Sequence, residues 1–114
     1  MEKTDVVAAL AALAQDNRLD VFRLLVQAGP EGMPAGAVAT ALDLAPNTLT
    51  FHLDRLRTAG LVTVRRDGRS MIYAAQFDTM NALLGFLTEN CCGGVQCAPA
   101  AECKPARKRA KVPA

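Results

Sequence analysis

Hydrophobic residues recur at the three- and four-residue intervals of an α-helix in five stretches of the chain. Pro34 suits the first turn of the third stretch, and Gly60 follows the fourth as a helix-ending glycine. Either Asp16 or Asn17 can cap the second. The pattern therefore predicts helices over about residues 4–14, 17–28, 34–42, 46–59 and 77–90.

The segment between the fourth and fifth helices has the character of β-structure. Leu61–Arg66 and Met71–Ala75 read as two short strands, and Asp67-Gly68 between them is a strong hairpin signal. The resulting order is helix, helix, helix-turn-helix, hairpin, helix. This order predicts a mainly α (α+β) winged helix-turn-helix, in which the β-ribbon extends the contact with DNA beyond the recognition helix.

The composition predicts one small domain with an aliphatic core, because 51% of the 114 residues are hydrophobic and only 4% are aromatic. The net charge of +2 hides an uneven distribution, since five basic residues lie within the last eleven positions. Residues 1–103 therefore carry a net charge of −3. DNA binding cannot rest on overall charge and must rest on where particular arginines lie. We expect a domain over residues 1–92 and a flexible tail over 93–114.

The sequence shows no signal peptide and no run of about 18 apolar residues that would span a bilayer. We therefore expect a cytoplasmic protein with no membrane partner, in a compartment that keeps thiols reduced. A structural disulfide is the less favoured reading of the four cysteines, and one between the adjacent Cys91 and Cys92 would be strained.

The fourth predicted helix separates a core face from a contact face. Leu49, Leu53 and Leu56 fall within an arc of about 60° at 100° per residue. Asn47, Phe51 and Asp54 lie on the opposite face, between flanks that hold Thr48, Thr50 and Arg55. Asparagine pairs well with adenine, and an aromatic group can contact a thymine methyl group. The alternative for Phe51 is burial in the core.

Two further groups complete the predicted DNA-binding surface. His52, the single histidine, lies near the edge of the core arc and suits either the core or a phosphate contact. Three arginines surround the hairpin turn, where they either face solvent or contact phosphates or the minor groove, and we favour DNA. The candidate DNA-binding residues are Asn47, Thr48, Thr50, Phe51, His52, Arg55, Arg65, Arg66 and Arg69.

Four segments together resemble the ArsR/SmtB family: Ala14-Gln15-Asp16-Asn17-Arg18-Leu19, Thr50-Phe51-His52-Leu53, residues 56–62 and the Arg-Asp-Gly-Arg turn. The resemblance covers about residues 5–92. It implies a repressor, not an enzyme, that binds operator DNA as a homodimer and releases it on binding a metal or metalloid. It also implies a dimer interface on the first and last helices, although these apolar residues can instead pack within one subunit: Val6, Leu10, Leu13, Met80, Leu83, Leu84 and Leu87.

All four cysteines lie within thirteen residues that follow the fifth predicted helix. The family's other sensor positions are absent, because the third helix lacks cysteine and the fifth lacks histidine. Cys91 and Cys92 after Glu-Asn, followed by Cys97, resemble an arsenic-responsive subgroup. That resemblance implies three thiolates on trivalent arsenic (arsenite), and often on antimonite, with Cys103 as a substitute ligand. Two thiols would suffice for methylated trivalent arsenicals.

Two other readings of the cysteines remain open. One is a thiol-redox sensing repressor, although the chain lacks the C-x-x-C motif of dithiol oxidoreductases. The other is a winged-helix DNA binder with a structural zinc site, although the cysteine spacing differs from that of paired zinc knuckles. Thiolates favour soft, thiophilic centres, which agrees with the arsenic reading.

Overall fold

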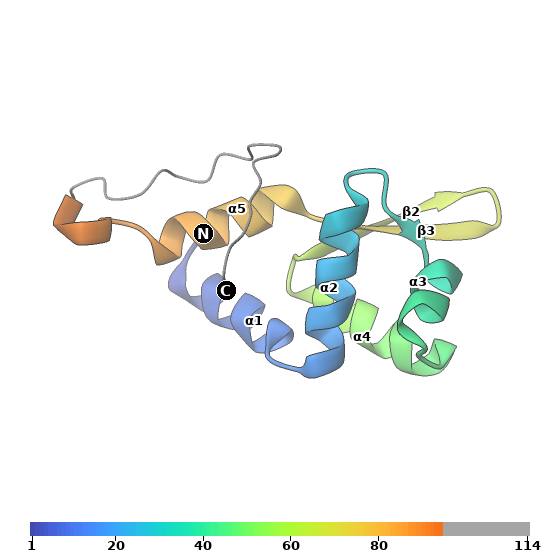
Figure 1. Ribbon diagram of the computed structural model, residues 1–114. Helices are drawn as coiled ribbons and strands as arrows, with labels where there is room; N and C mark the ends of the chain where they lie inside the picture. The colour runs from blue at the N-terminus through green and yellow to red at the C-terminus, as the bar shows by residue number, and fades with distance from the viewer. Residues whose placement is uncertain (95–114) are drawn as a thin grey trace, which may run out of the picture.

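The computed structural model describes residues 1–94, so the predicted tail beyond residue 94 and two of the four cysteines lie outside the described part. The predicted fold class is confirmed: a helix-turn-helix made by α3 and α4 is followed by a β-hairpin wing and a final helix (Figure 1). The elements are α1 Lys3–Leu13, α2 Asp16–Ala28, β1 Met33–Pro34, α3 Ala35–Leu42, α4 Pro46–Thr58, β2 Val62–Asp67, β3 Ser70–Ala75, α5 Phe77–Leu87 and the 3-10 helix η1 Cys91–Gly94.

The sheet has three antiparallel strands in the order β1-β3-β2, whereas the sequence pattern predicts only the hairpin. The missing strand, β1, is two residues long, with Met33 opposite Tyr73 and Pro34 opposite Ile72. So short a strand has no periodicity of its own, and it exists because β3 lies beside it. Pro34 is therefore extended and caps α3, rather than forming the first turn of that helix.

The observed ends of α2, α4 and α5 agree only in part with the boundaries predicted from the sequence. Gln15 caps α2, because its side-chain oxygen accepts a 2.9 Å hydrogen bond from the Arg18 backbone N–H. The expected cap at Asp16 or Asn17 is therefore wrong, and both residues lie inside the helix. The expected end of α4 is confirmed, since Gly60 adopts the left-handed conformation (φ 82°) just after it. α5 ends at Leu87, three residues earlier than predicted.

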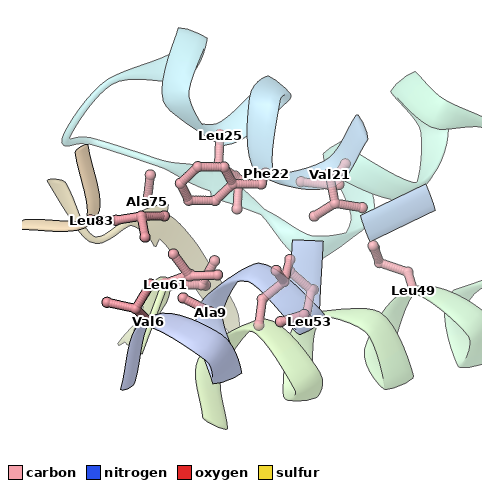
Figure 2. Packing of buried hydrophobic residues seen from close by; sticks show 14 residues of the cluster. Val6, Ala9, Val21, Phe22, Leu25, Leu49, Leu53, Leu61, Ala75 and Leu83 are labelled. Carbon is pink, nitrogen blue, oxygen red and sulfur yellow. The ribbon is translucent and has the colours of Figure 1, made fainter. Parts of the chain in front are cut away.

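The core lies where α1, α2, α4 and the base of the wing meet (Figure 2). Leu53 of α4, Leu25 of α2 and Leu61 before β2 are fully buried. Val6 and Ala9 bring α1 into this cluster, and Leu83 brings α5. Burial of these side chains fixes α4 against the rest of the domain. None of the helices between residues 1 and 94 combines the length and the apolar character that crossing a bilayer requires.

We expect Gly32→Ala to lower the free energy of unfolding by about 1–3 kcal/mol. Gly32 has φ 75°, and an added Cβ would collide with the backbone carbonyl of Tyr73, which belongs to the strand that pairs with β1. The matched control is Gly36→Ala in α3, where no atom lies within 4 Å of the added carbon. Urea unfolding at a fixed protein concentration should show the control unchanged or more stable by up to about 1 kcal/mol. Equal stability of the two variants would contradict the steric argument.

Candidate nucleic-acid interface and thiol site

α4 presents a contact face because its leucines are buried on the other side. Leu49, Leu53 and Leu56 are at most 1% exposed, whereas Phe51 is 50% exposed. The predicted outward orientation of Phe51 is therefore confirmed, and the alternative of burial in the core is wrong. Asn47 and Thr48 are also exposed, at the start of the helix. The half-exposed phenyl ring therefore lies among polar residues on the outer side of α4.

Phe51 organises its neighbours on this face. The guanidinium carbon of Arg55 lies 4.9 Å from the centre of the phenyl ring, within the range of a cation–π interaction. The His52 ring meets the same phenyl ring edge-on, with centroids 5.7 Å apart. Thr50 donates its hydroxyl hydrogen to the Pro46 carbonyl at 2.9 Å. Thr50 therefore offers a partner its lone pairs and its methyl group, and Arg55 offers a guanidinium that is already held in place.

His52 lies inside the domain rather than on the contact face. Its side chain is 6% exposed, so its candidate role in DNA binding is not supported by its position, and the core reading holds. Its Nδ1 has no hydrogen-bond partner among the residues that the structure describes, and the same is true of the buried Nε of Arg18. Burial, and secondarily the positive charge of Arg18, lower the pKa of His52 below its usual 6.5. His52 is therefore a neutral support beneath Phe51.

The wing carries the three predicted arginines, and one of them differs from the other two in its hydrogen bonding. Arg65, Arg66 and Arg69 are all exposed. Arg65 donates a 3.1 Å hydrogen bond from Nη2 to the carbonyl oxygen of Glu31, in the loop between α2 and β1. This bond ties the wing to the body of the domain. Arg66 lies near the end of β2, and Arg69 lies in the two-residue turn that joins β2 to β3, where long cations can reach a phosphate backbone.

The pair Asp54 and Arg57 was not among the candidate DNA-binding residues. Arg57 Nη2 and Asp54 Oδ1 are 3.7 Å apart, and both side chains are about half-exposed. The i, i+3 spacing of opposite charges could have indicated this pair from the sequence. It gives the contact face a second oriented guanidinium, on the opposite flank of α4 from Arg55.

Two of the predicted thiol ligands lie together on η1. The sulfur atoms of Cys91 and Cys92 are 3.6 Å apart, and both residues are exposed. Asn90, Cys92 and Gly93 have positive φ angles, and this backbone conformation is unfavourable for the first two. Contrary to the preferred reading of the sequence, Cys92 is in a disulfide. Cys97 and Cys103 lie outside the described residues. Among residues 1–94, no three His, Cys, Asp or Glu side chains are grouped to hold a metal.

The residues predicted to form a dimer interface fall into three groups. Val6 and Leu83 are buried within the protomer and have little surface to offer a second copy. Leu10, Leu84 and Leu87 are exposed large apolar side chains on α1 and α5. Leu13 and Met80, with Leu84, line a hollow of about 450 Å³ between α2 and these two helices. α1 and α5 lie at the end of the molecule opposite the wing (Figure 1).

Comparison with known proteins supports a regulatory role. Residues 13–65 match a helix-turn-helix domain family. The nodulation protein NolR of Rhizobium meliloti is 34% identical over 89 residues, which cover 77% of this chain and 70% of that protein. A protein of Halobacterium salinarum named for repression of an arsenical resistance operon is 36% identical over 63 residues, or 55% of this chain and 48% of its own length.

A solved structure agrees with the fold. The homodimeric winged helix-turn-helix DNA-binding domain of a possible ArsR-family regulator from Mycobacterium bovis has a TM-score of 0.62 and 26% sequence identity. The match covers 84% of this chain and 89% of that domain.

We expect the imidazole of His52 to titrate below pH 6.5, because burial favours its neutral form. The unfolded chain takes up this proton near pH 6.5, so the stabilisation is complete above that pH and is lost as the pH falls toward the folded-state pKa. NMR of the single histidine gives the midpoint directly. In His52→Gln, urea unfolding between pH 7.5 and 5.5 should show a smaller loss of stability than in wild type. A midpoint at or above 6.5 would contradict the assignment.

Proposed function

We propose that this chain, which belongs to the ArsR family of winged helix-turn-helix transcriptional regulators, is a homodimeric repressor that leaves its operator DNA when trivalent arsenic binds its C-terminal cysteines. Family membership places it among DNA-binding regulators rather than enzymes. The observation that carries the arsenic proposal is the Cys91–Cys92 pair, with its sulfurs 3.6 Å apart just after the final helix.

The sulfur separation fits two bonds to one centre. Metal–sulfur bonds of about 2.3 Å, as for zinc, allow two sulfurs on one atom to be up to about 4.6 Å apart. Trivalent arsenic carries a lone pair and takes three sulfurs in a pyramid, so Cys97 or Cys103 would supply the third. With arsenous acid, each thiol proton leaves with one hydroxyl group as water. A cellular thiol must first reduce the disulfide at Cys92. Three As–S bonds then replace three As–O bonds, and this exchange involves no further oxidation or reduction. Antimonite would react in the same way, and a methylated trivalent arsenical would need only two thiols.

The dimer proposal rests on apolar surface that the protomer leaves uncovered. Leu10 on α1 and Leu84 and Leu87 on α5 are exposed, and they adjoin the apolar hollow described above. A second copy could pack its α1 and α5 against the same two helices and remove this apolar surface from water. Each Å² of apolar surface buried in this way would stabilise the dimer by about 25 cal/mol. Two-fold symmetry would then present two α4 helices to the two halves of a palindromic operator.

Packing between helices offers a route from the thiols to DNA. η1 follows α5, and α1 packs against both α5 and α4. A centre that binds Cys91 and Cys92 must impose its own angles on a segment with two unfavourable backbone conformations. A resulting shift of α5 would change the dimer interface and hence the spacing of the two α4 helices. A coupling free energy of about 1–3 kcal/mol between the two sites is typical of allostery.

A second candidate function is release by thiol oxidation in the cytoplasm. The observation that favours it is the disulfide at Cys92. In this version, oxidation of the thiols rather than arsenic binding would reshape η1. The two functions use the same residues but differ in the signal, so peroxide and arsenite titrations of the reduced protein separate them.

We expect arsenite to release the reduced wild-type protein from a duplex of its own promoter, with affinity falling by about five- to hundredfold. Fluorescence anisotropy of the labelled duplex measures this release. Cys91→Ser and Cys92→Ser should bind DNA normally and no longer respond to inorganic arsenite. Cys97→Ser and Cys103→Ser form a matched pair that identifies the third ligand, because only the variant lacking it should fail to respond. Release by peroxide but not by arsenite would favour the redox function instead.

We expect Leu84→Lys to weaken dimerisation at least tenfold, because it places a charge in the proposed apolar interface. Met71→Lys is the matched control, since Met71 is a similarly exposed apolar residue but belongs to β3 in the wing. Sedimentation equilibrium measures the monomer–dimer constant of each variant. A dimer weakened equally by both changes, or by neither, would contradict an interface on α5.

A further inference from the structure

We propose that Asp54 reads the operator sequence directly, by accepting a hydrogen bond from the N4 amino group of a cytosine. The inference rests on DNA binding by this family and on α4 entering the major groove, but it does not depend on arsenic. Asp54 is the one acidic residue of α4, a helix whose other exposed residues beyond Pro46 are polar, aromatic or cationic. An acidic side chain at that place requires a physical explanation.

Asp54 belongs to the ridge of α4 that points away from the core. Asn47, Phe51 and Asp54 are spaced by four and three residues, so they lie on one side of the helix, opposite the buried leucines. The Asp54 side chain is 54% exposed, close to the value for Phe51. When the contact face of α4 lies along the floor of the groove, Asp54 therefore faces base edges and not a phosphate wall.

The chemistry of the groove limits what a carboxylate can contact there. Phosphate oxygens repel it, and the guanine N7 and O6 and thymine O4 atoms are acceptors that offer it no hydrogen. The remaining donors are the amino groups of cytosine and adenine. The adenine amino group lies between two acceptors, its own N7 and the O4 of the paired thymine, whose lone pairs repel a carboxylate. The cytosine amino group has an acceptor on one side only, the O6 of the paired guanine. Cytosine is therefore the base edge that Asp54 fits best.

Arg57 reduces the electrostatic cost of a carboxylate near DNA and orients the Asp54 side chain. Its Nη2 lies 3.7 Å from Asp54 Oδ1, which partly offsets repulsion between the carboxylate and nearby phosphates. An exposed ion pair contributes little to the free energy of folding. Its role in this proposal is to orient the Asp54 carboxylate. Arg57 and Arg55 lie on opposite flanks of the ridge, the first beside Asp54 and the second over the ring of Phe51. Arg57 is thus a positioning residue for Asp54, and its guanidinium remains half-exposed toward the phosphate wall.

The competing explanation is that Asp54 faces solvent and merely lowers the affinity for all DNA. The two explanations predict different results for base preference. A base-reading carboxylate affects one position of the operator, since base contacts carry sequence information. A general repulsive charge affects every sequence equally, because the phosphate backbone is the same throughout.

The test is selection from a pool of random DNA duplexes by the reduced full-length protein, followed by sequencing of the bound fraction. Wild type should select cytosine at one position in each half-site. Asp54→Ala should reduce that preference by about tenfold while leaving the other positions unchanged. Asp54→Asn should shift the preference toward adenine, the base that asparagine pairs with best. The matched control is Thr58→Ala, an exposed residue one turn further along α4, which should keep the wild-type preference.

Three results would overturn the inference, and they are distinguishable. If Asp54→Ala bound all sequences more tightly with unchanged base preferences, Asp54 would be only a repulsive charge. If Thr58→Ala lost the same preference, the effect would belong to the helix and not to the carboxylate. If wild type retained no duplex, DNA recognition itself would fail, and the proposed repressor function with it. Failure of arsenite to release bound DNA, by contrast, would overturn the arsenic proposal alone.

Discussion

Burial of the leucine side of α4 is the constraint on which the rest of this structure depends. Leu49, Leu53 and Leu56 are enclosed by the other helices, so the helix cannot rotate about its axis without exposing them. Exposure of a single leucine would cost about 1.5–3 kcal/mol. The opposite ridge is therefore directed outward with little freedom. The residues proposed to contact DNA therefore take their orientation from leucines on the opposite side of the helix.

The polar residues beneath α4 extend the same constraint. His52 is buried next to Phe51, and its burial keeps it neutral beside the positive charge of Arg18. Arg18 also anchors the start of α2 through the hydrogen bond from its backbone to the Gln15 side chain. The Phe51 ring in turn holds Arg55. Arg18, at the start of α2, thus acts on His52 through its charge, and His52 and Arg55 both contact the Phe51 ring on the outer side of α4.

The two ends of the molecule have different physical characters. The wing and α4 present arginines, whereas α1 and α5 present apolar side chains and lead to the two adjacent cysteines of η1. The wing lies at the opposite end of the molecule from α5 and η1 (Figure 1). The core must hold the first end rigid, because base contacts require fixed geometry. The thiol end lies on a short segment with unfavourable backbone conformations, which a bound ligand can reshape at smaller cost. α1 packs on both α4 and α5 and joins the two.

The sequence by itself determined the five helices, the hairpin and the outward position of Phe51, because a helix of 3.6 residues per turn fixes which residues share a face. It also placed Gly60 correctly, since the left-handed conformation after a helix favours glycine. Only the tertiary structure decided features that depend on a distant neighbour. β1 exists through its pairing with β3, His52 and Val6 are buried by other helices, and Arg65 bonds to Glu31, thirty-four positions away. Local periodicity specifies an element and its faces, but what covers each face is set by packing between elements.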